Sequence, residues 1–454
     1  MRSLSMFSLA LLASCAAPSG DQVSKSYPEV QPGGISLPAM QAFAPQSQTA
    51  VTHSNAELAQ LFLRLEFQLE SGRDLTALSR FEGPITVAVT GAPPNGAQAE
   101  LNRLLARFQA EAGLDVRATT TAQSASITVN FVPAAQMKRL VPTAACFVVP
   151  GVSSLAEYRD ARGTAAVDWA HITQRARVAV FIPDSTSPQE VRDCLHEELA
   201  QAMGPLNDLY ELGDSVFNDD NFNTVLTDFD MLMLRLHYAP ELQSGMNEVQ
   251  VASLLPGMLA RVNPQGATAT GRLAPPPSPL AWSNLVARAM GLGGTGGRRA
   301  AADQMVSMAM AQGWTDTRAG LAYFLSGRLA AQTDPARAVA LFGRAAQIYR
   351  AVPGGALHAA HVDLQLAAIA LSAGQNDQAL AFADRATGAV TAGQNAAMLT
   401  TLMLIKAQAL QDLGRDAEAQ ALRLDTLGWA RYGFGSDQAL RAKTAEIAAL
   451  AARG

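Results

Sequence analysis

Alanine-rich segments separated by short turns fill the chain from residue 282 to residue 454, and they limit its fold most strongly. The turns contain Gly, Asn or Asp, and the apolar residues between them follow the spacing of one helix face. Ala338 and Ala379 lie about 40 residues apart, as do Gly374 and Gly414. This pattern predicts stacked helix pairs at 317–331 with 335–350, 357–373 with 377–390, and 395–413 with 416–430.

One part of this region is similar to the second helix of a tetratricopeptide repeat. The positions that match are Ala338, Phe342 and Ala345, and in part Ala379 and Ala386. The period is longer than the usual one of about 34 residues. We interpret residues 282–312 as a degenerate first pair and 435–452 as a capping helix. The resemblance implies a concave surface that binds a protein or peptide partner. The alternative is a plain helical bundle that supports the first domain.

A second constraint is the stretch VRDCLHEELAQAMGPLND, residues 191–208. Its pattern predicts a helix that ends at Gly204, and we expect this glycine to adopt a left-handed conformation. Glu197 and Gln201 are four residues apart, so their side chains share one face of the helix. Several polar side chains that could bind a ligand or take part in a reaction therefore meet on that face.

This stretch resembles the HExxHxxGxxH motif of the metzincin-type zinc peptidases. In that motif histidines bind zinc, the glutamate is the general base, and the glycine turns the chain. The resemblance puts Glu197, Gln201 and Asn207 at the three metal-ligand positions, Glu198 at the general-base position and Gly204 at the structural turn. None of the three ligand positions holds a histidine.

The ligand chemistry decides how this departure is interpreted. Zinc prefers nitrogen and sulfur, whereas Glu, Gln and Asn offer only oxygen here. Such a set could bind calcium or magnesium loosely. We therefore predict no cofactor, with a divalent metal as the alternative. A third interpretation is a purely structural helix, because it also has an apolar face made of Leu195, Leu199, Ala202 and Met203.

Residues 51–250 show alternating helical and strand patterns. Helical spacing occurs in NAELAQLFLRLEFQLES and at 96–112, and strands are predicted at 84–91, 126–132, 146–150 and 177–183. This order predicts a small α+β domain with the helix of residues 191–208 packed on a sheet. The zincin plan has the same arrangement, with the active helix under a mostly parallel sheet.

The segments EELAQAMGPLNDLYELGDSVFNDDNF and LTDFDMLMLRLHYAPELQSGM resemble a secreted bacterial family, domain of unknown function 2927. NAELAQLFLRLEF and GPITVAVTG are similar to its opening helix and first strand. The resemblance covers roughly residues 51–250. It implies a zincin-like domain in an exported protein, with no demonstrated reaction and with the Glu/Gln/Asn pattern as a family feature.

An acidic stretch begins the segment 213–246. Five of its residues fall at EF-hand ligand positions, namely Asp219, Asn221, Asn223, Thr227 and Asp230, but Thr224 stands where that motif needs a glycine. We interpret the stretch as a solvated loop, with a calcium loop as the alternative.

The first residues, MRSLSMFSLALLASCAAPSG, are typical of a bacterial lipoprotein signal. Residues 1–14 are then the signal peptide, Cys15 carries the lipid, and residues 15–50 form a disordered tether. Ala16 is not the aspartate of inner-membrane retention, so we expect an anchor in the outer membrane, facing the periplasm. The alternative is an ordinary secretory signal with a chance cysteine.

Export bears on the other two cysteines. An oxidising compartment favours a disulfide between Cys146 and Cys194, and two free buried thiols are the alternative. Residues 251–281 include a Pro-rich run and are predicted to be a linker. The formal net charge is −5 and no basic block occurs, so nucleic-acid binding is not expected.

Two functions follow from these features. The first is a lipid-anchored cell-envelope scaffold, in which a catalytically degenerate zincin-like domain is joined to tetratricopeptide-like repeats that bind a protein. The second is a metal-dependent hydrolase of peptide or cell-wall material, with Glu198 as its general base.

Overall fold

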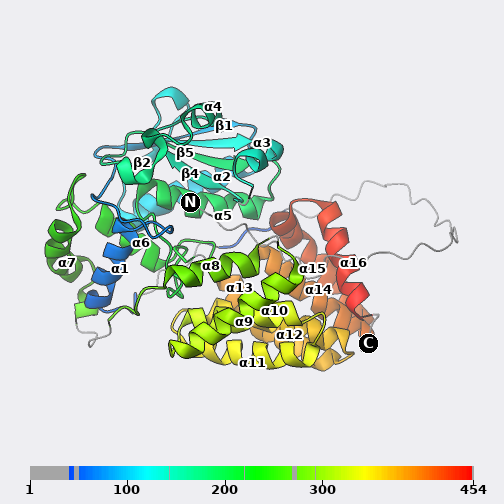
Figure 1. Cartoon of the computed structure of the whole chain (residues 1–454). Helices are drawn as coiled ribbons and strands as arrows, with labels where there is room; N and C mark the ends of the chain where they lie inside the picture. Colours follow the sequence, from blue (N-terminus) through cyan, green and yellow to red (C-terminus); the bar gives the residue numbers. More distant parts are fainter. Residues whose placement is uncertain are drawn as a thin grey trace.

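The computed structural model describes residues 40–44, 51–142, 144–218, 220–267, 273–291 and 293–451. An α/β domain is followed by a stack of helices (Figure 1). The predicted signal peptide, Cys15 and most of the predicted tether lie outside the described residues. Within the described residues, no helix combines the length and apolar character that crossing a bilayer requires.

The α/β domain contains five strands and seven helices within the described residues. Its strands are β1 (Ile85–Gly91), β2 (Val116–Ala118), β3 (Ile127–Val132), β4 (Phe147–Pro150) and β5 (Val178–Pro183). Its helices are α1 (Asn55–Phe67), α2 (Ala97–Arg107), α3 (Ala134–Leu140), α4 (Leu155–Ala161), α5 (Pro188–Met203), α6 (Asp228–His237) and α7 (Glu248–Val262).

The strands form one sheet in the order β2-β1-β3-β5-β4. The first four are parallel to their neighbours, and β4 runs antiparallel to β5 at the edge. Alternate side chains face two apolar layers: Val148 and Val180 pack with α2 and α5, while Phe147 and Phe181 pack with α3 and α4. Because helices cover both faces of a mainly parallel sheet, the domain is α/β rather than the predicted α+β.

Helix α5 has well-defined ends. Ser187 and Glu190 form a capping box, and Pro188 occupies the first turn. Gly204 ends the helix as expected, but with φ −144 it is not left-handed, so that prediction is wrong. A Cβ at Gly204 would lie 2.9 Å from Leu234 Cδ2, so the glycine is needed for the close approach of α6.

The predicted linker is partly wrong. Its first residues belong to α7, which buries Val251, Leu255 and Leu259 in the core of the α/β domain. The proline-rich residues that follow are bound on both sides, because the Pro275 carbonyl accepts from Arg64 and the Pro276 carbonyl accepts from Arg318. The described residues 273–279 are thus held by both domains.

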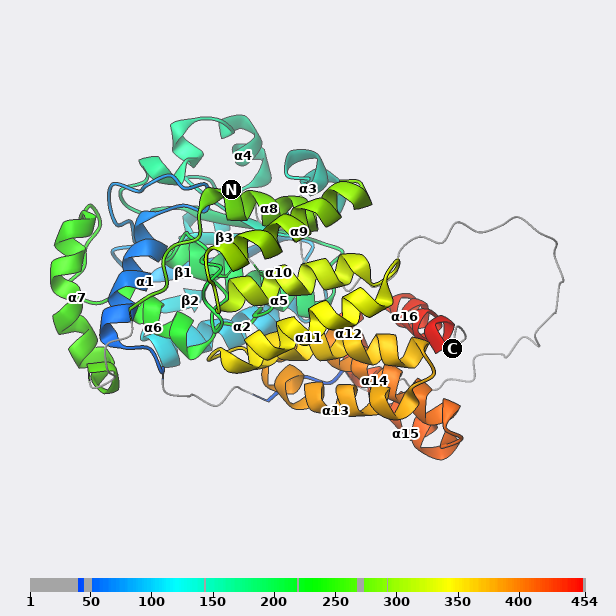
Figure 2. The same ribbon diagram turned by 60° about the horizontal axis from the view of Figure 1, so that its bottom comes forward.

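The C-terminal region consists of nine helices within the described residues. They are α8 (Leu280–Met290), α9 (Thr295–Ala311), α10 (Thr317–Ala330), α11 (Pro335–Ala351), α12 (Ala356–Ser372), α13 (Asn376–Ala392), α14 (Ala396–Asp412), α15 (Asp416–Phe434) and α16 (Asp437–Ala451). Successive helices lie side by side in a continuous stack (Figure 2). The predicted helix pairs are confirmed within a few residues.

Small residues set the close packing of these pairs. A Cβ at Gly327 on α10 would lie 2.9 Å from the Phe342 ring on α11, and a Cβ at Gly320 would lie 2.4 Å from the Tyr349 ring. Ala338, Phe342 and Ala345 are fully buried, as their spacing implied. Phe342 and Tyr349 on α11 therefore each fit against a glycine on α10.

Residues 40–44, inside the predicted tether, lie against the helical stack. Phe43 contacts Trp429 with ring centroids 4.5 Å apart. The Gln41 N–H donates to the Gly428 carbonyl at 3.2 Å. The Gln394 side chain donates to the Ala44 carbonyl at 2.9 Å. This part of the tether is thus attached to α15 and to the turn before α14.

Candidate binding site between the two domains

A cavity of about 420 Å³ lies where α5 meets the helical stack. One wall comes from α5, with Gln189, Asp193 and Glu197, and from the interdomain loop, which we define as residues 213–218 and 220–226. The other wall comes from α10, α12 and the helices from α14 to α16. Figure 1 shows α5 on the side of the sheet that faces the stack. Neither domain alone could form this cavity.

The interdomain loop fills the junction. Phe222 lies among aromatic side chains of the stack, 5.3 Å from the ring of Phe324, 4.7 Å from that of His358 and 4.5 Å from that of His361. Asp220 also pairs with His358 at 2.9 Å. The prediction of a solvated loop is therefore wrong, because the second domain removes most of this acidic stretch from water.

The same stretch uses its polar groups for local structure. Asp230, fully buried, accepts from the hydroxyl of Ser215 at 2.5 Å and caps α6 together with Thr227. Burial raises the pKa of Asp230 to about 7, although these hydrogen bonds act in the opposite direction. Two of the residues considered for an EF-hand are thus committed to the start of α6, and Asp219 lies outside the described residues.

Helix α5 is also bonded directly to the stack. Arg192 donates to the Gln394 carbonyl at 2.7 Å, and its guanidinium lies over the Tyr432 ring. Gln189 bonds twice: its amide nitrogen reaches Asn395 at 3.1 Å, and its oxygen accepts from the Ala397 N–H at 2.9 Å. These contacts fix the position of α5 against the turn before α14.

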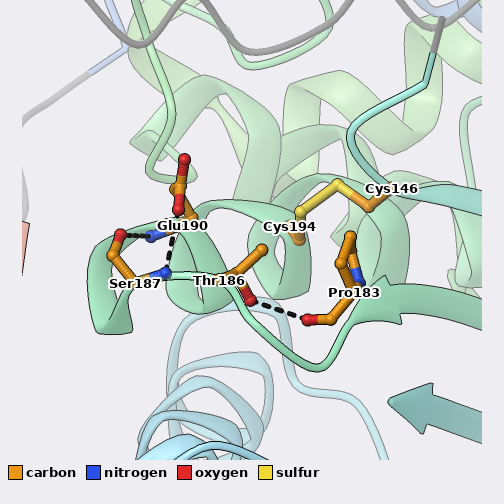
Figure 3. Close-up of a disulfide and its surroundings, with 6 residues drawn as sticks. All are labelled: Cys146, Pro183, Thr186, Ser187, Glu190 and Cys194. Carbon is orange, nitrogen blue, oxygen red and sulfur yellow. Dashed lines mark hydrogen bonds between the residues drawn. A yellow bond between two sulfur atoms is a disulfide. The ribbon is translucent and has the colours of Figure 1, made fainter. Parts of the chain in front are cut away.

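The predicted disulfide between Cys146 and Cys194 is confirmed, and both cysteines line the cavity. Figure 3 shows it beside the capping box of Ser187 and Glu190. Cys146 directly precedes β4, so the bond joins the edge of the sheet to the middle of α5. It holds the α5 wall of the cavity at a fixed distance from the sheet.

Of the four residues expected at a metal site, Glu197 lines the cavity, and Glu198, Gln201 and Asn207 do not. Within the described residues, Glu197 has no hydrogen-bond or ion-pair partner. Burial, reinforced by Glu70 and Asp193, raises the pKa of Glu197 to about 7. A half-buried carboxyl group that changes charge near neutral pH therefore faces this cavity.

Glu198 has a different environment. Only 2% of it is exposed, and burial raises its pKa well above the usual range of a glutamate, with repulsion from Glu197 and Glu70 acting in the same direction. Burial therefore favours the neutral form of its carboxyl. A protonated carboxyl cannot accept a proton from water, so this environment does not suit a general base.

The turn after α5 is occupied by structural bonds. Arg175 donates to the carbonyls of Gln201 and Gly204 at 2.7 and 2.6 Å. Asn207 donates to the Arg64 carbonyl at 2.9 Å, and its oxygen accepts from the Asp208 N–H at 3.0 Å. An oxygen-only set with Asn207 committed in this way does not fit zinc. No cluster of three or more His, Cys, Asp or Glu suited to a metal occurs within the described residues.

The sequence did not single out the residues of the opposite wall. His361 and Gln365 both lie on α12 and line the cavity. They are one turn apart on a helix that is otherwise rich in Ala and Leu. Such a polar pair on an apolar helix was a usable signal, because buried polar side chains require partners.

Comparison with known proteins gives one match. No curated protein and no solved structure matches the chain. Residues 55–257, which span the α/β domain from the first residue of α1 into α7, match the model of the family described as "Protein of unknown function (DUF2927)".

Proposed function

We propose that this protein is a lipid-anchored binding protein of the bacterial cell envelope, without catalytic activity. It would bind a protein or peptide partner between its two domains. The observation that carries the proposal is the cavity between α5 and the helical stack, because side chains of both domains line it. Concave sites at domain junctions are common places for ligands.

The α/β domain is proposed to be a degenerate zincin-like domain. Its support is a mostly parallel sheet with α5 packed against one face, together with the spacing of Glu197, Glu198, Gln201, Gly204 and Asn207. The absence of histidine at the ligand positions and the structural use of Asn207 argue against a catalytic metal.

The helical stack is proposed to be tetratricopeptide-like. Its support is the run of antiparallel helix pairs and the fit of Phe342 against Gly327 within the first of the regular pairs. Repeats of this kind bind extended segments of other proteins on their inner surface. Here that surface would work together with α5, which explains why the two domains are bonded so closely.

The proposed location is the periplasmic side of the outer membrane, with Cys15 carrying the lipid. The Cys146–Cys194 disulfide supports export, since structural disulfides persist in oxidising compartments. The attachment of residues 40–44 to α15 would leave the preceding residues as the tether to the membrane.

Position-specific photo-crosslinking in the native envelope tests the binding function. A photoreactive amino acid is introduced at Gln365 or Asn395 in the cavity, and at Glu418, which faces solvent, as the matched control. We expect a crosslinked partner at the cavity positions and none at Glu418. Equal crosslinking at all three positions, or none in the cavity, would contradict the proposal.

The competing function is a hydrolase that uses Glu198. The observation in its favour is that two adjacent carboxyl groups, Glu197 and Glu198, have raised pKa values and that Glu197 lines the cavity. Strongly shifted pKa values are typical of active sites. The burial of Glu198 away from the cavity weighs against it.

A further inference from the structure

The cavity contains three polar groups that the folded chain leaves without a partner. Within the described residues, neither the Glu197 carboxyl nor the Gln365 amide has a hydrogen-bond partner. The Nε2 atom of His361 is buried and has none either. All three residues line the same cavity. Gln365 is buried and Glu197 is half-buried, and polar groups removed from water without a partner are costly, so together they indicate a space that suits a polar ligand.

These groups come from opposite walls. Glu197 projects from α5, and Gln365 and His361 lie one turn apart on α12, so both project from the same side of that helix. The other charged groups in the lining are mostly paired already: Asp220 with His358, and Lys443 with Glu446. The charge on the α5 wall that has no partner is therefore the negative charge of Glu197.

Apolar side chains complete the lining. Phe222, Phe324 and Leu325 contribute to it beside the polar groups. The volume of about 420 Å³ falls in the range of about 300–1,000 Å³ typical of small-ligand sites. The cavity thus suits a compact ligand with one cationic end, groups that can donate and accept hydrogen bonds, and one apolar side chain.

We propose that this cavity binds the amino-terminal end of a short peptide. Its ammonium group would pair with Glu197, its first peptide groups would bond Gln365 and His361, and an apolar side chain would lie against Phe222 and Phe324. This inference deepens the proposed binding function and rests on it. An amide side chain can both donate to a peptide carbonyl and accept from a peptide N–H, which suits Gln365 to a peptide ligand.

The state of the two ionisable partners agrees with this assignment. Burial lowers the pKa of His361 to about 3, with His358 and Arg328 adding to the effect, so its ring is neutral and adds no positive charge to the site. An ammonium group beside Glu197 would favour the ionised carboxylate and offset the repulsion from Glu70 and Asp193.

The test uses the chain without its predicted signal peptide and lipid, residues 16–454, and a library of free tripeptides. The same tripeptides with an N-acetyl group, which lack the ammonium charge, show whether the free amine is needed for binding. Binding is followed by native mass spectrometry and measured by calorimetry for the tightest members. We expect one peptide per chain and at least tenfold weaker binding of the acetylated forms. Equal affinity of the two libraries, or no bound peptide, would overturn the proposal.

Two variants locate the site. Glu197→Gln and Gln365→Leu should each weaken the binding of the best free peptide at least tenfold. The check on folding is a thermal unfolding temperature no lower than that of the parent, because removing the ionised Glu197 relieves an unfavourable burial. Glu418→Gln, on the exposed surface of α15, is the matched control and should bind as the parent does. Unchanged binding by Glu197→Gln would overturn the assignment of the ammonium group.

The outcome also separates this inference from the function on which it rests. If photo-crosslinks form at Gln365 but free and acetylated tripeptides bind alike or not at all, the amine specificity is wrong and the binding function stands. If crosslinks fail as well, both are wrong.

Discussion

Asp220 of the interdomain loop and His358 of α12 form a contact of 2.9 Å across the domain boundary, with neither side chain exposed by more than 1%. Phe222, two residues further on, lies in the same aromatic group. The α/β domain thus inserts part of its own chain into the core of the helical stack. The two domains should therefore unfold together.

Phe222→Ala tests this coupling. Removing a buried aromatic ring leaves a cavity and should lower the free energy of unfolding by about 3–5 kcal/mol, measured by urea denaturation. Calorimetry should then resolve two transitions where the parent shows one. Val249→Ala, at a site 79% exposed, is the control and should change little. A single unchanged transition in Phe222→Ala would show that the loop does not join the domains.

His53 gives a prediction about pH. Burial alone would lower its pKa, but hydrogen bonds to Asp214 and Glu57 raise the pKa of His53 to about 10. The protonated ring therefore stabilises the folded state fully below about pH 6.5, and this contribution is lost as pH rises through about 10. His53→Gln should cost on the order of 1–3 kcal/mol at pH 6.5 and almost nothing at pH 11. A cost that does not change with pH would refute the ion pair.

The Cys146–Cys194 disulfide should also contribute to the free energy of unfolding. The Cys146→Ser, Cys194→Ser double variant should lose about 2–4 kcal/mol, because the bond closes a loop with a sequence separation of 48 residues in the unfolded chain. Urea denaturation measures the loss, and the parent treated with reductant is the comparison. Since both cysteines line the cavity, the variant should also bind its partner less tightly.

Glu198→Gln separates the two functions. The raised pKa of Glu198 means that ionisation destabilises the folded state as pH rises above about 4.3, the usual value of a glutamate. The variant should therefore match the parent in stability near pH 4 and exceed it at pH 8. If the protein is a binding protein, Glu198→Gln should also bind its partner as tightly as the parent does. Loss of an activity on peptide or cell-wall substrates, with the fold intact, would favour the hydrolase.

The sequence was sufficient for elements whose pattern is local. The strands around Val129 and Val180 and the helix pairs around Ala338 and Ala379 follow from periodicity, because one buried face determines each of them. The disulfide followed from the count of cysteines and the predicted export. The family resemblance correctly covered the α/β domain.

Contacts between residues that lie far apart in the sequence could not be predicted. The acidic loop near Asp220 looked solvated, and only its contact with His358, 138 residues away, makes it a buried junction. Gly204 looked like a left-handed cap, but its role comes from Leu234 on another helix. The cavity itself was not predictable, because Glu197 and Gln365 come together only when the two domains pack.

The metal content of the soluble protein, residues 16–454, isolated from a periplasm without chelator, tests the central claim most directly. In our account α5 forms a wall of a binding cavity, and its oxygen-only positions are not a catalytic metal centre. We predict no stoichiometric metal, measured by elemental analysis of the purified protein. One bound transition metal per chain that is lost in Glu197→Ala would contradict the account and support the hydrolase.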